Sequence, residues 1–191
     1  MKEIEKHLQS YLGIPEKEVE KISSYFNLVE MERDTYLIKS GKYNPGLSFV
    51  QQGYLRIFTI DEASGKEITQ WISCPGTFVT DAAALFFDGP ARWDIQAVSD
   101  CKLLSISQEN FKKIGDHISN WPHLEKLFLA KCFMTLEDRV FSHLSLSSED
   151  RYKMFFQYNP ELFNNVPLQY IASMLGMTPE TFSRIRKKLS S

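Results

Sequence analysis

Apolar side chains recur at helical spacing at the start of the 191-residue chain. Ile4 and Leu8 lie one turn apart, and Gly13 ends this first run. Val19 and Ile22 continue the pattern after a break. The spacing predicts two short helices at the N-terminus.

The pattern then changes to short β-rich runs between turn signals, from about residue 31 to residue 107. A polar loop at residues 61–66 separates two runs, as expected for a hairpin. Short strands at fairly regular intervals are typical of an antiparallel sandwich or barrel. The predicted strands cover residues 36–38, 47–60 with a break at Gly53, 68–72, 94–98 and 102–106.

A single long helix is predicted from Asn120 to Leu144, a stretch without glycine and with Pro122 near its start. We expect the β domain to cover one of its two apolar sides and the same helix of a second subunit to cover the other. A helix buried within a monomer is the alternative. One stripe is Leu129, Phe133, Leu136, Val140 and Leu144; the other, expected at the dimer contact, is Leu124, Leu127, Met134 and Phe141.

Composition is that of a globular protein, with 43% hydrophobic and 24% charged residues. No run approaches the ~18 apolar residues of a membrane span, and no signal peptide precedes the first helix. Cys74, Cys101 and Cys132 are too widely spaced for a disulfide framework or a paired metal site. These features predict a cytoplasmic protein with no membrane contact.

The formal net charge of −2 is unevenly distributed. Residues 166–191 contain four basic residues and one acidic residue, a charge of +3, so the remainder of the chain carries −5. A short basic segment on an acidic body indicates a localised binding face. A solvated helix end is the alternative, because cations also favour helix C-termini.

The basic segment begins with the spacing of a helix-turn-helix. Ala172 is small where two helices would cross, and Gly176 suits the turn between them. Thr178 can cap the second helix, whose buried face would be Phe182, Ile185 and Leu189. An ordinary αα-hairpin explains the apolar positions but not the small residue, glycine, cap and basic tail together.

The outward face of this second helix predicts contacts to double-stranded DNA. Arg184 can donate two hydrogen bonds to guanine and Glu180 can accept one from cytosine, unless the two merely pair with each other. The basic residues that follow suit phosphates. The candidate DNA-binding residues are Gln169, Thr178, Pro179, Glu180, Thr181, Ser183, Arg184, Arg186, Lys187 and Lys188.

The stretch VPLQYIASMLGMTPETFSRIRKKL and the segment FVQQGYLRIF…GKEITQWI…GTFVTD resemble the Crp/Fnr family of bacterial transcription regulators, of the Bacteroidetes type. The resemblance implies an α+β fold with an N-terminal antiparallel β-roll (a jelly roll like that of cyclic-nucleotide-binding domains), a long central dimerisation helix and a C-terminal helix-turn-helix of winged-helix type. The expected domains are 1–116 (sensor), 117–147 (dimerisation helix) and 148–191 (DNA-binding). The implied partners are DNA with a two-fold-symmetric operator, a second copy of the chain, RNA polymerase and a small-molecule effector.

Members that bind cyclic nucleotides carry Gly-Glu for the ribose and then Arg with Ser or Thr for the cyclic phosphate. An ungapped match places Thr80-Asp81 at the Gly-Glu pair and shifts Arg92 by one residue, which turns a side chain to the other face of a strand. We therefore expect no binding of cyclic AMP. The candidate effector-pocket residues are Phe78, Thr80, Asp81, Arg92 and Trp93.

Many family members continue past the recognition helix, whereas this chain ends two residues after Leu189. We expect this truncation to reduce the affinity for DNA. The alternative function is a small-molecule sensor that signals through protein partners.

A cupin-like enzyme is a third possibility, but all four histidines lie outside the predicted strands, and no catalytic or metal-binding motif is present. We expect no enzyme activity, catalytic residues, cofactor or metal site.

Overall fold

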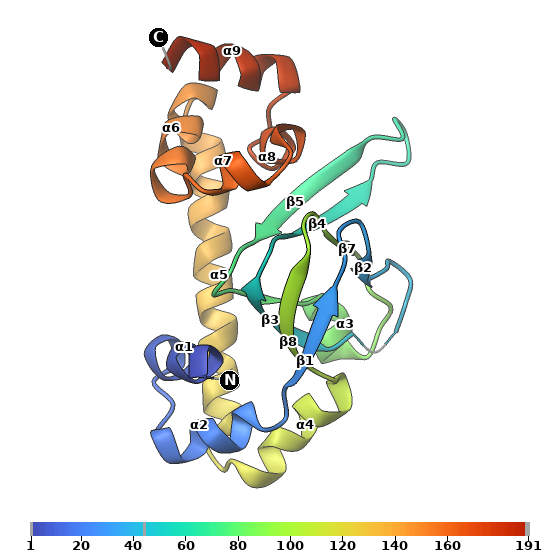
Figure 1. Cartoon of the computed structure of the whole chain (residues 1–191), viewed down its shortest axis with the longest axis vertical. Helices are drawn as coiled ribbons and strands as arrows, with labels where there is room; N and C mark the ends of the chain where they lie inside the picture. The colour runs from blue at the N-terminus through green and yellow to red at the C-terminus, as the bar shows by residue number, and fades with distance from the viewer. Residues whose placement is uncertain (1, 44, 190–191) are drawn as a thin grey trace.

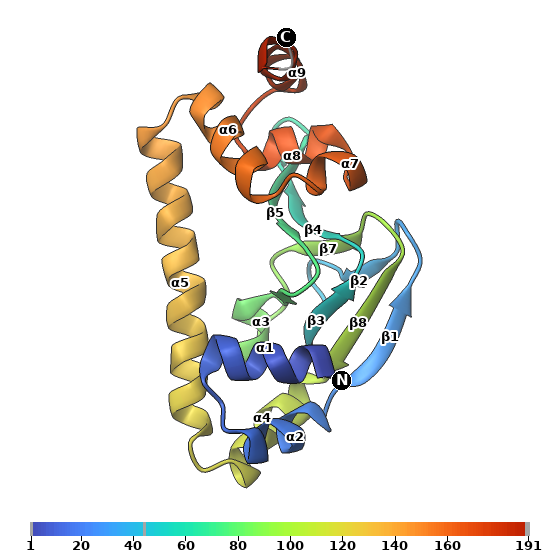
Figure 2. The ribbon, with the colours of Figure 1, turned by 60° about the vertical axis from the view of Figure 1, so that its left-hand side comes forward.

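The computed structural model describes residues 2–43 and 45–189, with the side chains of residues 11 and 12 also outside the description. Two helices, α1 (Lys2–Leu12) and α2 (Glu16–Ser23), come first, as predicted. Ile4, Leu8, Val19 and Ile22 are all buried. Figure 2 shows α1 lying between the long helix α5 (Trp121–Ser145) and the sheets, and it contacts both α5 and a strand of the β-roll.

The strands of the described chain form two four-stranded antiparallel sheets, which confirms the predicted β-roll (Figure 1). One sheet has the order β1-β8-β3-β6 and the other β2-β7-β4-β5. Buried side chains from both sheets, among them Val50, Leu55, Ile95 and Leu103, fill the space between them. The strands are β1 (Asn27–Met31), β2 (Tyr36–Ile38), β3 (Leu47–Gln52), β4 (Leu55–Ile60), β5 (Glu67–Ser73), β6 (Phe78–Val79), β7 (Asp94–Ala97) and β8 (Cys101–Ile106).

Two of these strands, β1 and β6, are absent from the prediction. The burial of β1 does not alternate cleanly, and β6 has only two residues, so neither produces a strong pattern of period two. β1 exists because it pairs with β8 from Asn27–Ser105 to Met31–Cys101. Tertiary pairing therefore decides these two elements.

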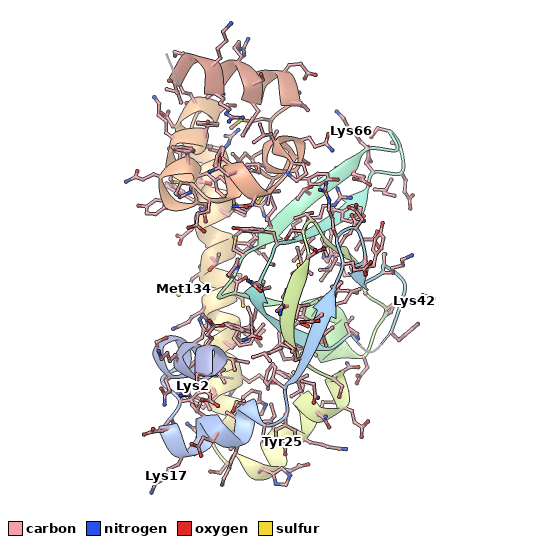
Figure 3. All side chains as sticks on the ribbon, viewed as in Figure 1. Lys2, Lys17, Tyr25, Lys42, Lys66 and Met134 are labelled. Atoms are coloured by element: carbon pink, nitrogen blue, oxygen red, sulfur yellow. The ribbon has the colours of Figure 1, made fainter. Side chains whose placement is uncertain are left out.

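The predicted hairpin joins β4 to β5 through residues 61–66. The amide of Asp61 donates to the carbonyl of Lys66 at 2.9 Å, and Gly65 takes a positive φ of 67°. The hairpin extends beyond the body of the roll toward the C-terminal helices, with Lys66 at its tip (Figure 3). This projection brings the β-roll into contact with the C-terminal helices.

Helices cover the roll at its lower end. Asp81 caps α3 (Ala82–Phe87), and Ser107 caps α4 (Gln108–His117). The long helix α5 (Trp121–Ser145) agrees with the predicted helix over residues 120–144. Trp121 and Leu124 of α5 are buried in the core that α1, α2 and α4 share.

The C-terminal helices are α6 (Ser148–Tyr158), α7 (Leu162–Asn165), α8 (Leu168–Met174) and α9 (Pro179–Leu189). They have their own core, which includes Tyr152, Phe163 and Phe182 and also Ile72 and Val98 of the roll. The described residues end with α9, so the winged-helix type stays a prediction.

Candidate nucleic-acid interface and sensor cavities

The turn between α8 and α9 follows from three residues. Gly176 has a φ of 68°, a conformation that other residues rarely adopt. Thr178 Oγ1 accepts a hydrogen bond from the amide of Thr181 at 3.2 Å and so caps α9, as predicted. Ala172 is fully buried where the helices meet. The turn fixes the angle at which α9 leaves α8.

The inner side of α9 is held by aromatic rings. The Phe182 ring lies 5.2 Å from Tyr152 and 5.9 Å from Phe163, measured between centroids. Phe182 and Ile185 are buried, as predicted. Leu189, which was expected to be buried too, is 40% exposed because it lies in the final turn of α9. The prediction for Leu189 is therefore wrong.

The outer side of α9 is open to solvent. Among the candidate DNA-binding residues only Thr181 is partly buried, by its place beside the cap. The exposed candidates are Gln169, Thr178, Pro179, Glu180, Ser183, Arg184, Arg186, Lys187 and Lys188. One helix with its preceding turn thus presents a continuous surface of hydrogen-bonding and cationic groups.

Two charged candidates have partners that the sequence did not reveal. Lys188 Nζ lies 2.6 Å from Glu149 Oε2 of α6, and Lys153 lies 2.8 Å from the other oxygen. Hydrogen bonds from Lys153 and Lys188 lower the pKa of Glu149 to about 2. Glu180 and Arg184 form no ion pair with each other in the described chain. The pKa of Glu180 is lowered by hydrogen bonds from its own amide and from Thr178, and also by Lys66.

A second contact joins α8 to the β4–β5 hairpin. The amide of Thr69 donates to Ser173 Oγ at 3.0 Å. The Tyr170 ring lies 4.0 Å from the guanidinium carbon of Arg56. Lys66 lines the same surface hollow as Gln169 and Thr178. The hairpin therefore borders the candidate DNA face.

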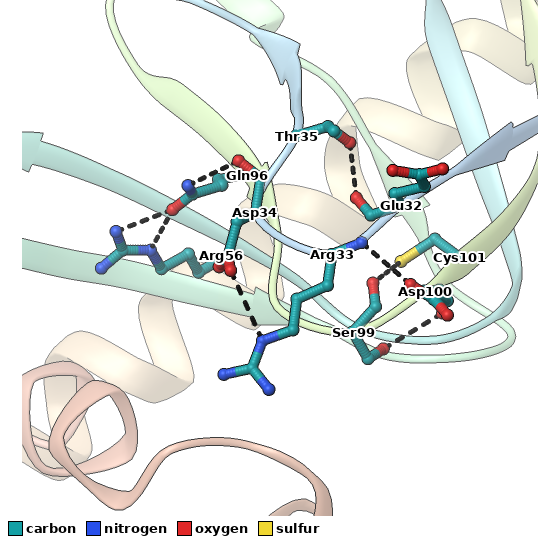
Figure 4. A network of polar contacts seen from close by, with 9 residues as sticks. All are labelled: Glu32, Arg33, Asp34, Thr35, Arg56, Gln96, Ser99, Asp100 and Cys101. Atoms are coloured by element: carbon teal, nitrogen blue, oxygen red, sulfur yellow. Dashed lines mark hydrogen bonds and ion pairs between the residues drawn. The ribbon is translucent and has the colours of Figure 1, made fainter.

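Arg56 is buried at this contact, with only 3% of its side chain exposed. Its Nη1 lies 2.5 Å from Glu67, and its Nε and Nη2 donate to Gln96 Oε1 at 3.1 and 2.8 Å. Gln96 in turn donates to the Asp34 carbonyl (Figure 4). Because its charge is paired with Glu67 and three of its five donors are used, Arg56 is a structural support for Tyr170.

Arg139 of α5 also connects the two halves of the chain. Its Nη1 donates to the Gln70 carbonyl of β5, and its Nη2 donates to the Met174 carbonyl of α8 at 3.0 Å. Burial lowers the pKa of this guanidinium. No sequence pattern singled out Arg139, because both partners are backbone atoms distant in sequence.

The five predicted effector-pocket residues do not line one cavity. Asp81 is buried, and its Oδ2 accepts hydrogen bonds from the amides of Arg92 and Trp93 at 2.6 and 3.1 Å. Its Oδ1 accepts one from the amide of Ala84 at 3.0 Å. Thr80 Oγ1 donates to the carbonyl of Gly46. A side-chain carboxylate thus occupies the backbone donors of this loop.

Phe78 faces a separate cavity of about 360 Å³ between the roll and α5. Its ring lies 5.6 Å from Phe128 and 5.5 Å from His7. Burial and the nearby Lys131 lower the pKa of His7. Trp71 and Arg139 complete the opposite end of this cavity.

The outer side of α5 is apolar and uncovered. Of the predicted dimer contacts, Leu127, Met134 and Phe141 are 37%, 60% and 70% exposed, and Met134 points away from the roll (Figure 3). Leu124 is only 3% exposed, so its assignment to a dimer contact is wrong. The stripe expected to lie under the β domain is exposed too: Leu129, Phe133, Leu136, Val140 and Leu144.

The side of α5 that faces the roll carries Phe128, Cys132, Thr135, Leu136 and Arg139, so it includes one member of the predicted stripe, Leu136. Because this side includes polar residues, it does not form an apolar stripe in the sequence. Apart from Leu124, the residues of both predicted stripes are exposed in the described chain.

No group of three or more potential metal-binding side chains occurs in the part of the chain that the structure describes. Over the same residues, none of the helices is both long and apolar enough to cross a membrane.

The β-roll matches a known domain family. Residues 28–117 match the family model of the cyclic nucleotide-binding domain, in agreement with the predicted β-roll. No curated protein matches the chain.

Solved structures of Crp/Fnr-family regulators share the fold of the chain over most of its length. The catabolite activator protein of Thermus thermophilus has a TM-score of 0.57 and 22% identity, and the match covers 93% of this chain and 84% of that one. FixK2 of Bradyrhizobium japonicum has a TM-score of 0.70 and 16% identity, with 86% and 84% covered. A putative cAMP-binding regulatory protein of Silicibacter pomeroyi has a TM-score of 0.68 and 20% identity, with 97% and 88% covered.

Proposed function

We propose that the protein is a homodimeric, sequence-specific DNA-binding regulator of transcription. The observation that carries the proposal is the exposed face of α9 behind a capped turn, with Arg184 and Lys187 open to solvent. α8 and α9 then act as a helix-turn-helix, and α9 is the recognition helix that enters the major groove. N-terminal residues of α9 contact bases, and the basic residues of its last turns contact phosphates.

Charge distribution supports this assignment. The four basic residues of the +3 segment are exposed on α9, whereas the rest of the chain carries −5. The acidic remainder of the chain repels DNA and the basic face attracts it, so the protein approaches DNA with α9 toward it.

Dimerisation through α5 is part of the proposal. Its exposed stripes include Phe133, Met134 and Phe141, each at least 60% exposed. Large apolar side chains gathered along one helix favour pairing with a second copy. A parallel pair of α5 helices would present two copies of α9 to half-sites about one DNA turn, ~34 Å, apart.

We propose that the β-roll does not bind cyclic AMP. The amides of Arg92 and Trp93, in the loop that resembles the cyclic-phosphate site, already donate to the Asp81 carboxylate. A cyclic phosphate would have to displace a buried, negatively charged side chain from these donors, at a high cost in free energy. Sensing of a different effector remains part of the proposal.

Selection of genomic fragments by the purified protein, followed by gel shifts in a salt titration, tests the main proposal. We expect an enriched site with two-fold symmetry and an affinity that falls steeply as salt rises, because phosphate contacts release counterions. An affinity that hardly changes with salt, or enrichment of no sequence, would overturn it.

A sensor that acts through protein partners is the second candidate. The exposed side of α6 favours it, because Met154, Phe156 and Tyr158 are 40%, 46% and 75% exposed. Failure to bind any DNA, together with a metabolite that raises the melting temperature, would support this candidate over the first.

A further inference from the structure

A cavity of about 440 Å³ lies where β5 meets α5, α6 and α8. Its walls are largely apolar and include Trp71, Ile72, Phe155, Leu162 and Met174. This volume is within the range of small-molecule sites, which are usually apolar with a few polar groups. The cavity is separate from the loop around Asp81.

The principal polar group in this cavity is Arg139. A guanidinium has five N–H donors, and Arg139 uses two of them, to the Gln70 and Met174 carbonyls. It forms no ion pair with any described acidic residue. Burial lowers its pKa, as expected for a cation without a counter-ion. A partly buried charge with unused donors is well suited to bind an anion.

The side chains that line the cavity include two arginines, Arg139 and Arg151, and one carboxylate, Asp138. Arg151 donates to the carbonyls of Leu175 and Leu146, so its charge has only neutral partners. Asp138 lines the cavity but is exposed and forms no ion pair among the described residues.

The neighbouring titratable groups do not supply the missing counter-ion. His143 uses its Nδ1 at the Arg139 carbonyl. Burial and the nearby Glu161 raise the pKa of the Cys74 thiol to about 11, so this thiol is neutral at pH 7.

We propose that this junction cavity binds a small organic carboxylate with a flat apolar body. The carboxylate accepts hydrogen bonds from Arg139, whose planar fork matches its two oxygens. The apolar body packs against Trp71 and Phe155. The Trp71 ring already lies 5.4 Å from the Arg139 guanidinium, so one ligand reaches both.

Binding there has a consequence for α8. A carboxylate bound to the unused donors draws the guanidinium toward itself and thereby weakens its hydrogen bonds to the Gln70 and Met174 carbonyls, which link β5 to α8. The position of α9 relative to the roll then depends on the ligand. This regulatory consequence rests on the proposed DNA-binding function, whereas the binding site itself does not.

The probe for the site is 2-naphthoate, and its neutral amide, 2-naphthamide, is the matched control. Methyl-labelled methionines report where the probe binds, because Met154 and Met174 line the cavity. Met31 packs within the roll and Met134 is on the outer side of α5, so neither lines it. We expect 2-naphthoate to shift the methyl resonances of Met154 and Met174 and to leave those of Met31 and Met134 in place.

A substitution tests the role of the guanidinium. Arg139→Gln should weaken 2-naphthoate binding by at least about tenfold, because a charge-assisted pair is lost. Arg33→Gln is the control and should bind like the wild type, because Arg33 is exposed and does not line the cavity. Arg139→Lys should bind with intermediate affinity, since it keeps the charge but loses the fork. If Arg139→Gln fails to fold, the methyl shifts and the amide control, both measured on the wild-type protein, still test the ligand site.

The absence of any methyl shift at about 10 mM 2-naphthoate, a concentration that detects even weak ligands, would overturn the proposal. Equal binding of 2-naphthamide, or unchanged affinity in a folded Arg139→Gln protein, would also overturn it. A gel shift with and without 2-naphthoate forms a separate arm. Absence of DNA binding both with and without 2-naphthoate would count against the proposed function, while the methyl shifts would still decide the ligand site.

Discussion

The Tyr170 ring of α8 lies 4.0 Å from the Arg56 guanidinium carbon of β4, although the two residues are far apart in the sequence. The Phe58 ring lies 3.8 Å from the same carbon. Because the Arg56 cation lies between the β4–β5 hairpin and α8, it links the β-roll to the C-terminal helices. Cation–π pairs of this kind contribute most where water is excluded.

Replacement of Tyr170 should loosen α8 from the hairpin. We expect Tyr170→Ala to lower the free energy of unfolding by about 2 kcal/mol, through the lost ring packing and cation–π contact. Tyr170→Phe keeps the ring and should change it by less than about 0.5 kcal/mol. Urea titrations of both variants measure this. Equal losses in the two variants would show that the ring does not contribute as argued.

The stabilisation that Glu149 provides at the contact between α6 and α9 should depend on pH. The folded-state pKa of Glu149 is lowered to about 2 from an ordinary 4.5, so its contribution to stability is present above pH 4.5 and is lost as the pH falls toward 2. The stability difference between wild type and Glu149→Gln should therefore shrink over this interval. Denaturant titrations at several pH values measure it, and a difference independent of pH would contradict the assignment.

Two neighbouring cations of α9 should affect DNA binding differently. Arg184→Ala should cost about 1–3 kcal/mol at the preferred site and relax the base preference at one position of each half-site. Lys187→Ala should weaken all sequences alike and reduce the salt slope by about 1. Binding to a panel of single-base variants of the selected site separates the two effects. A uniform loss in Arg184→Ala would remove it from base recognition.

A charge on the outer side of α5 should separate the proposed dimer. Phe141→Glu places a carboxylate in an apolar contact and should raise the dimer dissociation constant by about a hundredfold or more. Leu28→Glu is the matched control, since Leu28 is 59% exposed in β1, away from α5. Light scattering after size-exclusion chromatography gives the mass. A Phe141→Glu protein that stays dimeric, or a wild type that is monomeric, would refute pairing through this side.

Asp81 should support folding strongly. Asp81→Ala leaves the amides of Ala84, Arg92 and Trp93 without their acceptor, which should cost about 2–4 kcal/mol. Asp81→Asn keeps one acceptor oxygen and should cost less. Thermal and urea unfolding measure both losses of stability.

Calorimetry with cyclic AMP on the wild type should show no binding heat, and saturable binding would overturn the proposed role of Asp81.

The sequence predicted those features that depend on local chemistry. The capped turn at Thr178, the hairpin loop at 61–66 and the long helix at 120–144 each have a signal within a few residues. The misplaced features depend on tertiary packing instead. Leu124 belongs to an exposed stripe by spacing, but the N-terminal helices bury it. The contact of Arg56 with Gln96 and that of Arg139 with Met174 join residues 40 and 35 positions apart, and no periodicity reveals them.

The carboxylate of Asp81 is an internal ligand, covalently attached next to the donors that it satisfies. Its effective concentration at those amides is far above what a diffusing metabolite reaches in a cell. On the proposed function, the amides of Arg92 and Trp93 therefore have an acceptor in the absence of any effector. A response to an effector would then originate at another part of the molecule.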